Sequence, residues 1–266
     1  LGLGEAAAIG AAIVTSILGS FVRFSSLVSN DALSWLLGGL AVYFWLKAEE
    51  NPATGRHFLF WSLVMIAGLF TKLSLLLLLP LPILSSVLQR RWKRSLCWLL
   101  WAMVVVLATV PLWIRNVQGF DSLLPLAAGF GEPNAGAPFS LPAWAYAARS
   151  LFFPWQEFWC GWLGGLLVLG VVLACAYLLI SSIAQLKNLR FPIPCALLFL
   201  ASLGAFVWLN LSYFQAEGRY LLVSWPVWVA LLGVGGRSVV RQWVLLGLLL
   251  APYLLFFVPF LEGAYV

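Results

Sequence analysis

The sequence predicts an all-α protein, a bundle of helices that crosses a membrane about nine times. Three observations predict this fold class. Hydrophobic residues make up 63% of the 266 residues and charged residues only 9%, whereas a soluble domain carries about 25% charged residues. Apolar runs recur along the chain at lengths near the 17–25 residues, roughly, that cross a bilayer. The 15 Trp residues are also consistent with a membrane-spanning fold, because Trp concentrates at membrane–water interfaces.

Nine apolar runs are the expected membrane spans of a single transmembrane domain that covers residues 1–266. No internal repeat divides them. Several runs are short, and the two between 58 and 88 can be drawn in more than one way. The runs are 6–22, 32–46, 58–70, 73–88, 96–114, 161–181, 191–211, 220–235 and 243–261.

The connection 116–159, between the fifth and sixth spans, is far longer than the roughly 2–8 residues usual between packed helices. Turn-forming residues at 118–121 begin it, and a segment rich in Gly and Pro follows at 129–138. Ser140 as N-cap with Pro142 in the first turn predicts a short helix through residue 153. The many aromatic residues of this helix and its flank favour a position in the membrane interface. The loop is either anchored to headgroups or a lid over a pocket.

The basic residues divide unequally between the two sides of the predicted bundle. The alternate loops that hold the larger set are expected in the cytoplasm, so the net charge of +6 reflects topology and not nucleic-acid binding. The run 89–94 is then a lipid-headgroup cluster. The larger set is Lys47, Arg56, Arg90, Arg91, Lys93, Arg94, Lys187, Arg190, Arg237 and Arg241, and the smaller set is Arg23, Lys72, Arg115, Arg149 and Arg219.

Metal and triad chemistry based on histidine is disfavoured, because His57 is the only histidine. The four cysteines lie in or beside apolar runs without metal-ligand spacing, which predicts reduced structural thiols. Residue 1 is Leu, and no basic segment precedes the first apolar run. We therefore expect the sequence to be a fragment that lacks its N-terminal part, and the span close to residue 266 suggests a cut there too.

Asn30 and Asp31 open the second span on the side opposite the larger basic set. They can cap the helix, since their side-chain oxygens accept hydrogen bonds from free N–H groups. Alternatively, the Asp31 carboxylate faces an outer cavity, where it would bind a sugar hydroxyl, a divalent metal or a proton.

Lys72 lies between two spans with almost no loop, in the run Thr71-Lys72-Leu73-Ser74. Its ammonium either extends to lipid headgroups or, with free N–H groups at a helix end, binds a phosphate. Arg115, which ends the fifth span, is either a membrane anchor or a second contact to that anion.

A polar segment between the seventh and eighth spans contains Gln215, Glu217, Arg219 and Tyr220. Glu217 and Arg219 either pair with each other, or Arg219 binds a phosphate through two oxygens at once, as a guanidinium can.

The order of these motifs resembles the GT-C superfamily of polytopic membrane glycosyltransferases. Among its branches, the protein mannosyltransferase-like and aminoarabinose transferase-like proteins are most similar. The motifs are 29–33 with Asp31, the Thr71-Lys72 turn after Gly68, Trp113-Ile114-Arg115-Asn116 before a long outer loop, and Gln215 followed by Gly218-Arg219-Tyr220. Leu73 departs from the glycine that many relatives have after the lysine.

This resemblance implies an enzyme that moves a sugar from a polyprenyl-phosphate donor to a lipid, glycan or protein acceptor at the extracytoplasmic face of a bacterial inner membrane. It implies that Lys72 and Arg219 contact the donor phosphate, with Arg115 as a third candidate. Asn30, Asp31, Gln215, Glu217 and Tyr220 are then candidate substrate contacts. The superfamily's catalytic aspartate lies in an outer loop that this sequence does not contain, and Asp31 is the candidate base within it.

Two other classes remain open from the sequence. A transporter or lipid flippase would also have many spans, but should carry ionisable groups near the middle of its helices. A non-catalytic membrane subunit of an envelope-assembly complex would share the composition. No dedicated metal-ligand spacing is present, although a divalent metal could use Asp31 together with ligands from outside this sequence.

Overall fold

The computed structural model describes residues 30–121, 123, 173, 180 and 191–212 of the chain. Within these ranges the chain forms helices and their connections and no strands, so the expected all-α class is confirmed there. The elements are α3 (Asn30–Glu50), α4 (Arg56–Thr71), the 3-10 helix η1 (Leu73–Leu78), α5 (Leu81–Leu88), α6 (Trp92–Ala108), α7 (Val110–Phe120) and α10 (Pro192–Ser212).

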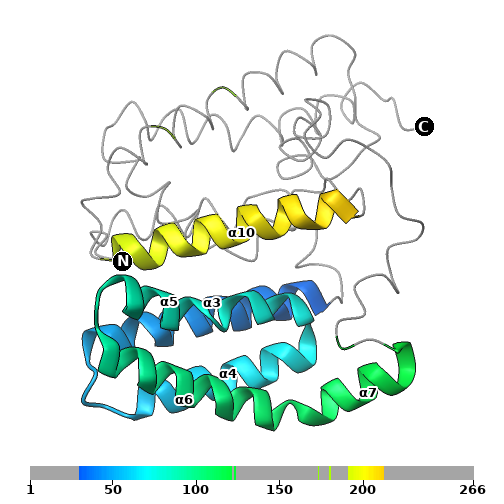
Figure 1. Ribbon diagram of the computed structural model, residues 1–266, viewed down its shortest axis with the longest axis horizontal. Coiled ribbons are helices and arrows are strands. Elements are labelled where there is room, and N and C mark those ends of the chain that lie inside the picture. The colour runs from blue at the N-terminus through cyan, green and yellow to red at the C-terminus, as the bar shows by residue number, and fades with distance from the viewer. Residues whose placement is uncertain (1–29, 122, 124–172, 174–179, 181–190, 213–266) are drawn as a thin grey trace, which may run out of the picture.

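The helices lie side by side and alternate in direction (Figure 1). Helix α3 packs along α4, α5 along α6, and α10 along α5. The ends of α3 and α5 therefore meet the beginnings of α4, α6 and α10 at one end of the bundle. The beginning of α3 and the end of α4 lie at the opposite end.

Large aromatic side chains fill the core near the first of these ends. Trp45, Trp61 and Trp98 are all almost completely buried. The ring of Trp98 lies 4.5 Å from that of Phe58 and 5.1 Å from that of Trp61, measured between centroids. Such tilted and edge-on aromatic pairs are favourable beyond the area that they bury. This cluster joins α3, α4 and α6.

The expected span 73–88 is broken into two pieces. Pro80 and Pro82 stand at the break, and a proline cannot donate a backbone hydrogen bond to the preceding turn. Residues 73–78 accordingly form a 3-10 helix, and α5 begins at Leu81.

The expected span 96–114 is bent. Helices α6 and α7 meet at an angle of 50°, with Pro111 in the first turn of α7. The buried hydroxyl of Thr109 donates to the carbonyls of Val105 and Val106 and accepts from Trp113 Nε1. Proline and an inserted hydroxyl are both recognised causes of helix bends.

Helix α7 continues to Phe120, beyond residue 116 where the long loop was expected to begin. Asp121 then ends the helix in the left-handed conformation, with φ of 51°. The remainder of the loop, its expected short helix, and the spans 6–22, 220–235 and 243–261 lie outside the described residues. So does span 161–181, except for residues 173 and 180.

Among the described residues, no helix by itself has both the length and the apolar composition needed to cross a membrane. The bent pair of α6 and α7 meets that criterion as a unit.

Candidate functional site

Lys72 is the predicted phosphate contact that the structure describes best. It is the single residue between α4 and η1 and has an extended backbone, with φ of −156° and ψ of 125°. Its N–H donates to the carbonyl of Gly68 at 2.7 Å, and its own carbonyl accepts from the N–H of Leu75 at 3.2 Å. Lys72 therefore both closes α4 and opens η1, and its side chain is half-buried in the turn.

The tightness of this turn depends on Gly68. A Cβ atom placed on Gly68 would lie 2.6 Å from Leu75 Cδ1 and 3.8 Å from Leu37 Cβ. Without a side chain at residue 68, the Leu75 side chain of η1 packs directly against α4. The sequence motif Gly68 to Ser74 thus corresponds to one compact structural unit, with the lysine at its corner.

Asn30 and Asp31 form the first turn of α3, at the same end of the bundle as Lys72 (Figure 1). The structure describes their backbone but not the surroundings of their side chains. It therefore does not decide between helix capping and a carboxylate that faces a cavity. The structure therefore brings these residues to the same end as the Lys72 turn, without defining a contact.

Arg115 lies on α7, beyond the bend, and is exposed. Its Nη2 donates to Asn116 Oδ1 at 3.3 Å. Asn116 is buried and donates from Nδ2 to the carbonyl of Leu123 at 3.2 Å. The described contacts of Arg115 thus belong to the end of α7 and do not join it to Lys72. Gln215, Glu217, Arg219 and Tyr220 lie outside the described residues.

A second polar site lies at the opposite end of the bundle, and sequence reasoning missed it. The carboxylate of Glu49, only 2% exposed, accepts hydrogen bonds from three side chains. Arg94 Nη1 lies 2.7 Å and Arg91 Nη1 3.3 Å from Oε2, and Trp98 Nε1 lies 3.0 Å from Oε1. Arg94 Nη1 also donates to the Glu49 carbonyl at 3.2 Å. We call Glu49, Arg91, Arg94 and Trp98 the Glu49 cluster.

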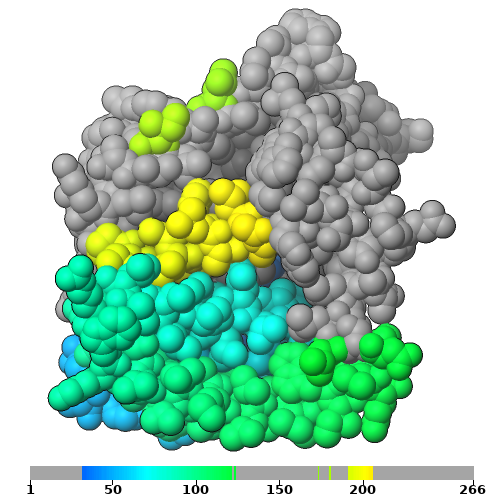
Figure 2. Space-filling view, viewed as in Figure 1, coloured from blue at the N-terminus to red at the C-terminus, as the bar shows by residue number. Residues whose placement is uncertain are grey.

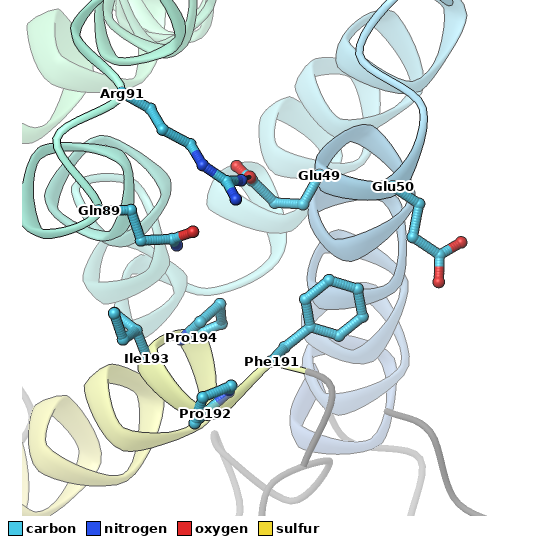
Figure 3. Close-up of a pocket in the computed structure, with 8 residues that line it drawn as sticks. All are labelled: Glu49, Glu50, Gln89, Arg91, Phe191, Pro192, Ile193 and Pro194. Carbon is cyan, nitrogen blue, oxygen red and sulfur yellow. Dashed lines mark hydrogen bonds and ion pairs between the residues drawn. The ribbon is translucent and has the colours of Figure 1, made fainter. Parts of the chain in front are cut away.

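The turn between α5 and α6 brings Arg91 to this cluster. Arg90 has φ of 56°, its N–H donates to the carbonyl of Val87, and the N–H of Arg91 donates to that of Ser86, both at 2.8 Å. These two bonds define a Schellman motif, with arginine at the left-handed position that glycine usually occupies. The chain reverses here, and the Arg91 guanidinium lies beside Glu49 (Figure 3).

A pocket of about 320 Å³ opens next to the Glu49 cluster. Three parts of the chain line it: Glu49 and Glu50 at the end of α3, Gln89 and Arg91 in the α5–α6 turn, and residues 191–194 at the start of α10 (Figure 3). Glu50 is bound by Lys47 at 2.9 Å, and Gln89 Nε2 donates to Ser85 Oγ at 2.9 Å. The sequence signal for this site was the pair Glu49-Glu50 after the apolar run 32–46, together with the strongly basic run 89–94, which was expected on the same side of the bundle.

Among the described residues, no group of three His, Cys, Asp or Glu side chains is placed to hold a metal ion. Cys97 and Cys195 are free thiols in the same part of the chain. The divalent metal and the reduced state of the other two cysteines remain predictions from the sequence.

The chain was compared with protein-family models, with curated proteins and with solved structures, and none of the three comparisons found a match.

Proposed function

We propose that this chain is part of an integral-membrane glycosyltransferase. It moves a sugar from a polyprenyl-phosphate donor to a lipid, glycan or protein acceptor at the extracytoplasmic face, in a bacterial inner membrane, within a bundle of about nine spans. The observation that carries the proposal is the position of Lys72. The lysine stands in a one-residue break between two apolar helices, at the opposite end of the bundle from the basic residues of 90–94.

The distribution of charge supports the membrane part of the proposal. Among the described residues, segments 32–46, 58–71, 73–89, 95–114 and 191–212 contain no acidic residue, lysine or arginine. The exposed face of α6 is apolar. This helix lies along the lower edge of the view in Figure 2. Exposed apolar surface of this extent is unusual in soluble proteins and suits contact with lipid tails. The exposed residues are Leu96, Leu99, Leu100, Met103, Val104, Val106 and Leu107.

The unequal distribution of basic residues between the two ends of the bundle supports the proposed orientation in the membrane. Lys47, Arg56, Arg90, Arg91, Lys93 and Arg94 gather at one end, which the positive-inside rule assigns to the cytoplasm. Lys72 and Asp31 then face the outside, where a donor with its polyprenyl tail in the bilayer would present its phosphate. Charges confined to the ends of the described helices count against a transporter, which needs ionisable groups near the midplane.

The reaction follows from the chemistry of such a donor. A carboxylate base takes the proton from the acceptor hydroxyl as its oxygen attacks the anomeric carbon. The bond between that carbon and the phosphate oxygen breaks, and the lipid phosphate leaves with added negative charge. The ammonium of Lys72, joined by Arg219, stabilises that charge most strongly in a water-poor corner. Asp31 is the candidate base within this sequence.

The test measures sugar transfer by the full-length protein in membranes. The probes are undecaprenyl phosphate carrying radiolabelled mannose, glucose or aminoarabinose, and label is counted in the lipid, glycan and protein fractions. We expect Lys72→Ala and Arg219→Ala each to lower turnover about 100-fold, since each removes a fixed positive group from the developing charge. Lys93→Ala, with the same charge loss at the other end, should keep full activity. Unchanged transfer in both site variants would refute the phosphate role.

A further inference from the structure

The pocket beside the Glu49 cluster has one wall of hydrogen-bonding side chains and one apolar wall. Gln89 and Arg91 form the first wall, in the α5–α6 turn, and residues 191–194 form the second, at the start of α10. Figure 3 shows the two walls facing each other across the open space. Such a site accommodates a ligand with a charged group attached to an apolar part.

Arg91 can bind a ligand without disturbing Glu49. Its bond to Glu49 Oε2 is long, at 3.3 Å, whereas Arg94 binds the same oxygen at 2.7 Å. The side chain of Arg91 is 51% exposed, while that of Arg94 is 17% exposed. Arg94 and Trp98 therefore suffice to hold the carboxylate. The remaining N–H groups of Arg91 make no other hydrogen bond to the described residues and can donate to an anion.

The local charge favours an anion. Both acids of the pocket are already neutralised, Glu49 by Arg94 and Glu50 by Lys47. With these two partners counted, three positive groups (Arg91, Arg94 and Lys47) face two carboxylates, so the pocket and its surroundings keep one net positive charge. Arg90 precedes Arg91 in the same turn, Lys93 follows in the first turn of α6, and both are exposed. A guanidinium with free N–H groups is the side chain best suited to bind two oxygens of a phosphate.

We propose that this pocket binds an anionic phospholipid of the leaflet at the basic end of the bundle. The lipid phosphate binds Arg91, and its glycerol and upper acyl chain lie against residues 191–194. Basic pockets between helices at the cytoplasmic ends of membrane proteins bind anionic headgroups in this way. The inference rests on the proposed membrane location but not on the transferase activity, which we assign to the opposite end.

Lipid binding is tested on the full-length protein, purified in a neutral detergent and stripped of lipid. Phosphatidylglycerol or phosphatidylcholine is added, and the bound lipid is counted by native mass spectrometry. We expect phosphatidylglycerol to be retained over phosphatidylcholine, and Arg91→Gln to weaken its binding about tenfold, as loss of a charge-assisted contact implies. Lys93→Gln is the matched control, because it removes the same charge two residues further along, in the first turn of α6 and outside the pocket lining. It should bind as the parent does.

A variant that fills the pocket tests whether lipid binding needs the pocket itself, apart from the charge beside it. Ile193→Trp leaves every basic residue in place and should also lower phosphatidylglycerol retention, while circular dichroism verifies that each variant is folded. Equal losses in Arg91→Gln and Lys93→Gln would show a diffuse basic surface and overturn the proposal. So would inorganic phosphate that competes as well as the lipid does, because the apolar wall would then have no role. Transferase activity is not read in this experiment, so its result is independent of the proposed function.

Discussion

At the scale of single residues, two neighbouring glutamates have very different surroundings. Glu49 is buried and accepts from Arg91, Arg94 and Trp98, whereas Glu50 makes an ion pair with Lys47 one turn earlier on the same helix. An ion pair between two residues of one helix contributes little to the free energy of unfolding. A buried carboxylate is different, because removing its charge leaves the half-buried guanidinium of Arg94 without its partner.

We expect Glu49→Gln to lower the free energy of unfolding by about 3 kcal/mol, the cost of breaking a buried ion pair by removing one partner. Glu50→Gln, the same chemical change one residue on, should cost less than about 1 kcal/mol. Thermal unfolding of both variants in detergent, followed by circular dichroism, measures the difference. Equal stability of the two variants would contradict a supporting role for the Glu49 cluster.

The sequence could not predict this cluster, although every residue in it is visible there. The partners of Glu49 lie 42, 45 and 49 residues further along the chain, and no local period relates such positions. By contrast, the position of Lys72 in a turn was predicted from the apolar runs on either side. Local patterns thus located Lys72, whereas the surroundings of Glu49 depend on the end of α3 meeting the start of α6.

At the scale of elements, the α4–η1 corner depends on close approach. Leu75 occupies the space where a side chain on Gly68 would begin. Gly204 on α10 has the opposite environment, with no atom within 4 Å of a Cβ placed on it. The two glycines therefore allow the same substitution to be compared in a crowded and in an open setting.

Gly204→Ala should stabilise the protein by up to about 1 kcal/mol, the difference in helix propensity between the two residues. Gly68→Ala should instead destabilise it by about 1–3 kcal/mol, because its methyl group overpacks against the buried Leu75. Denaturation midpoints in the same detergent measure both changes. An equal gain in the two variants would show that the corner relaxes freely.

The element boundaries were predicted unevenly. Spans 32–46, 58–70 and 191–211 correspond to α3, α4 and α10 within a few residues, because continuous apolar runs set them. The break at Pro80 and the bend at Thr109 were not predicted, since hydropathy alone does not register a missing N–H or a hydroxyl bonded into the helix. The end of α7 at Asp121 depends on a left-handed residue beyond the last apolar position.

At the scale of the whole molecule, the described charges separate to the two ends of the bundle. This separation gives the proposed topology an experimental test that is independent of activity. Lys93 lies on the exposed surface at the basic end. Gly119, at the end of α7, has no atom within 4 Å of a Cβ placed on it, so a reactive side chain fits at either position.

We expect a membrane-impermeant maleimide to label Gly119→Cys in intact cells and Lys93→Cys only after the cells are permeabilised, because the proposed topology places the basic end in the cytoplasm. The parent chain, with its own four cysteines, supplies the background. Mass spectrometry of the labelled peptides measures the outcome. Labelling of Lys93→Cys from outside would reverse the orientation and remove the outer position of Lys72.

The spacing of the Glu49 cluster along the chain also constrains the order of events during synthesis. Arg94 leaves the ribosome 45 residues after Glu49 does. At a usual elongation rate, of roughly 5–20 residues per second, that interval lasts about 2 to 9 s. During it the carboxylate must remain in water or bind another cation. Glu49 therefore reaches its final surroundings only after the first turns of α6 have left the ribosome.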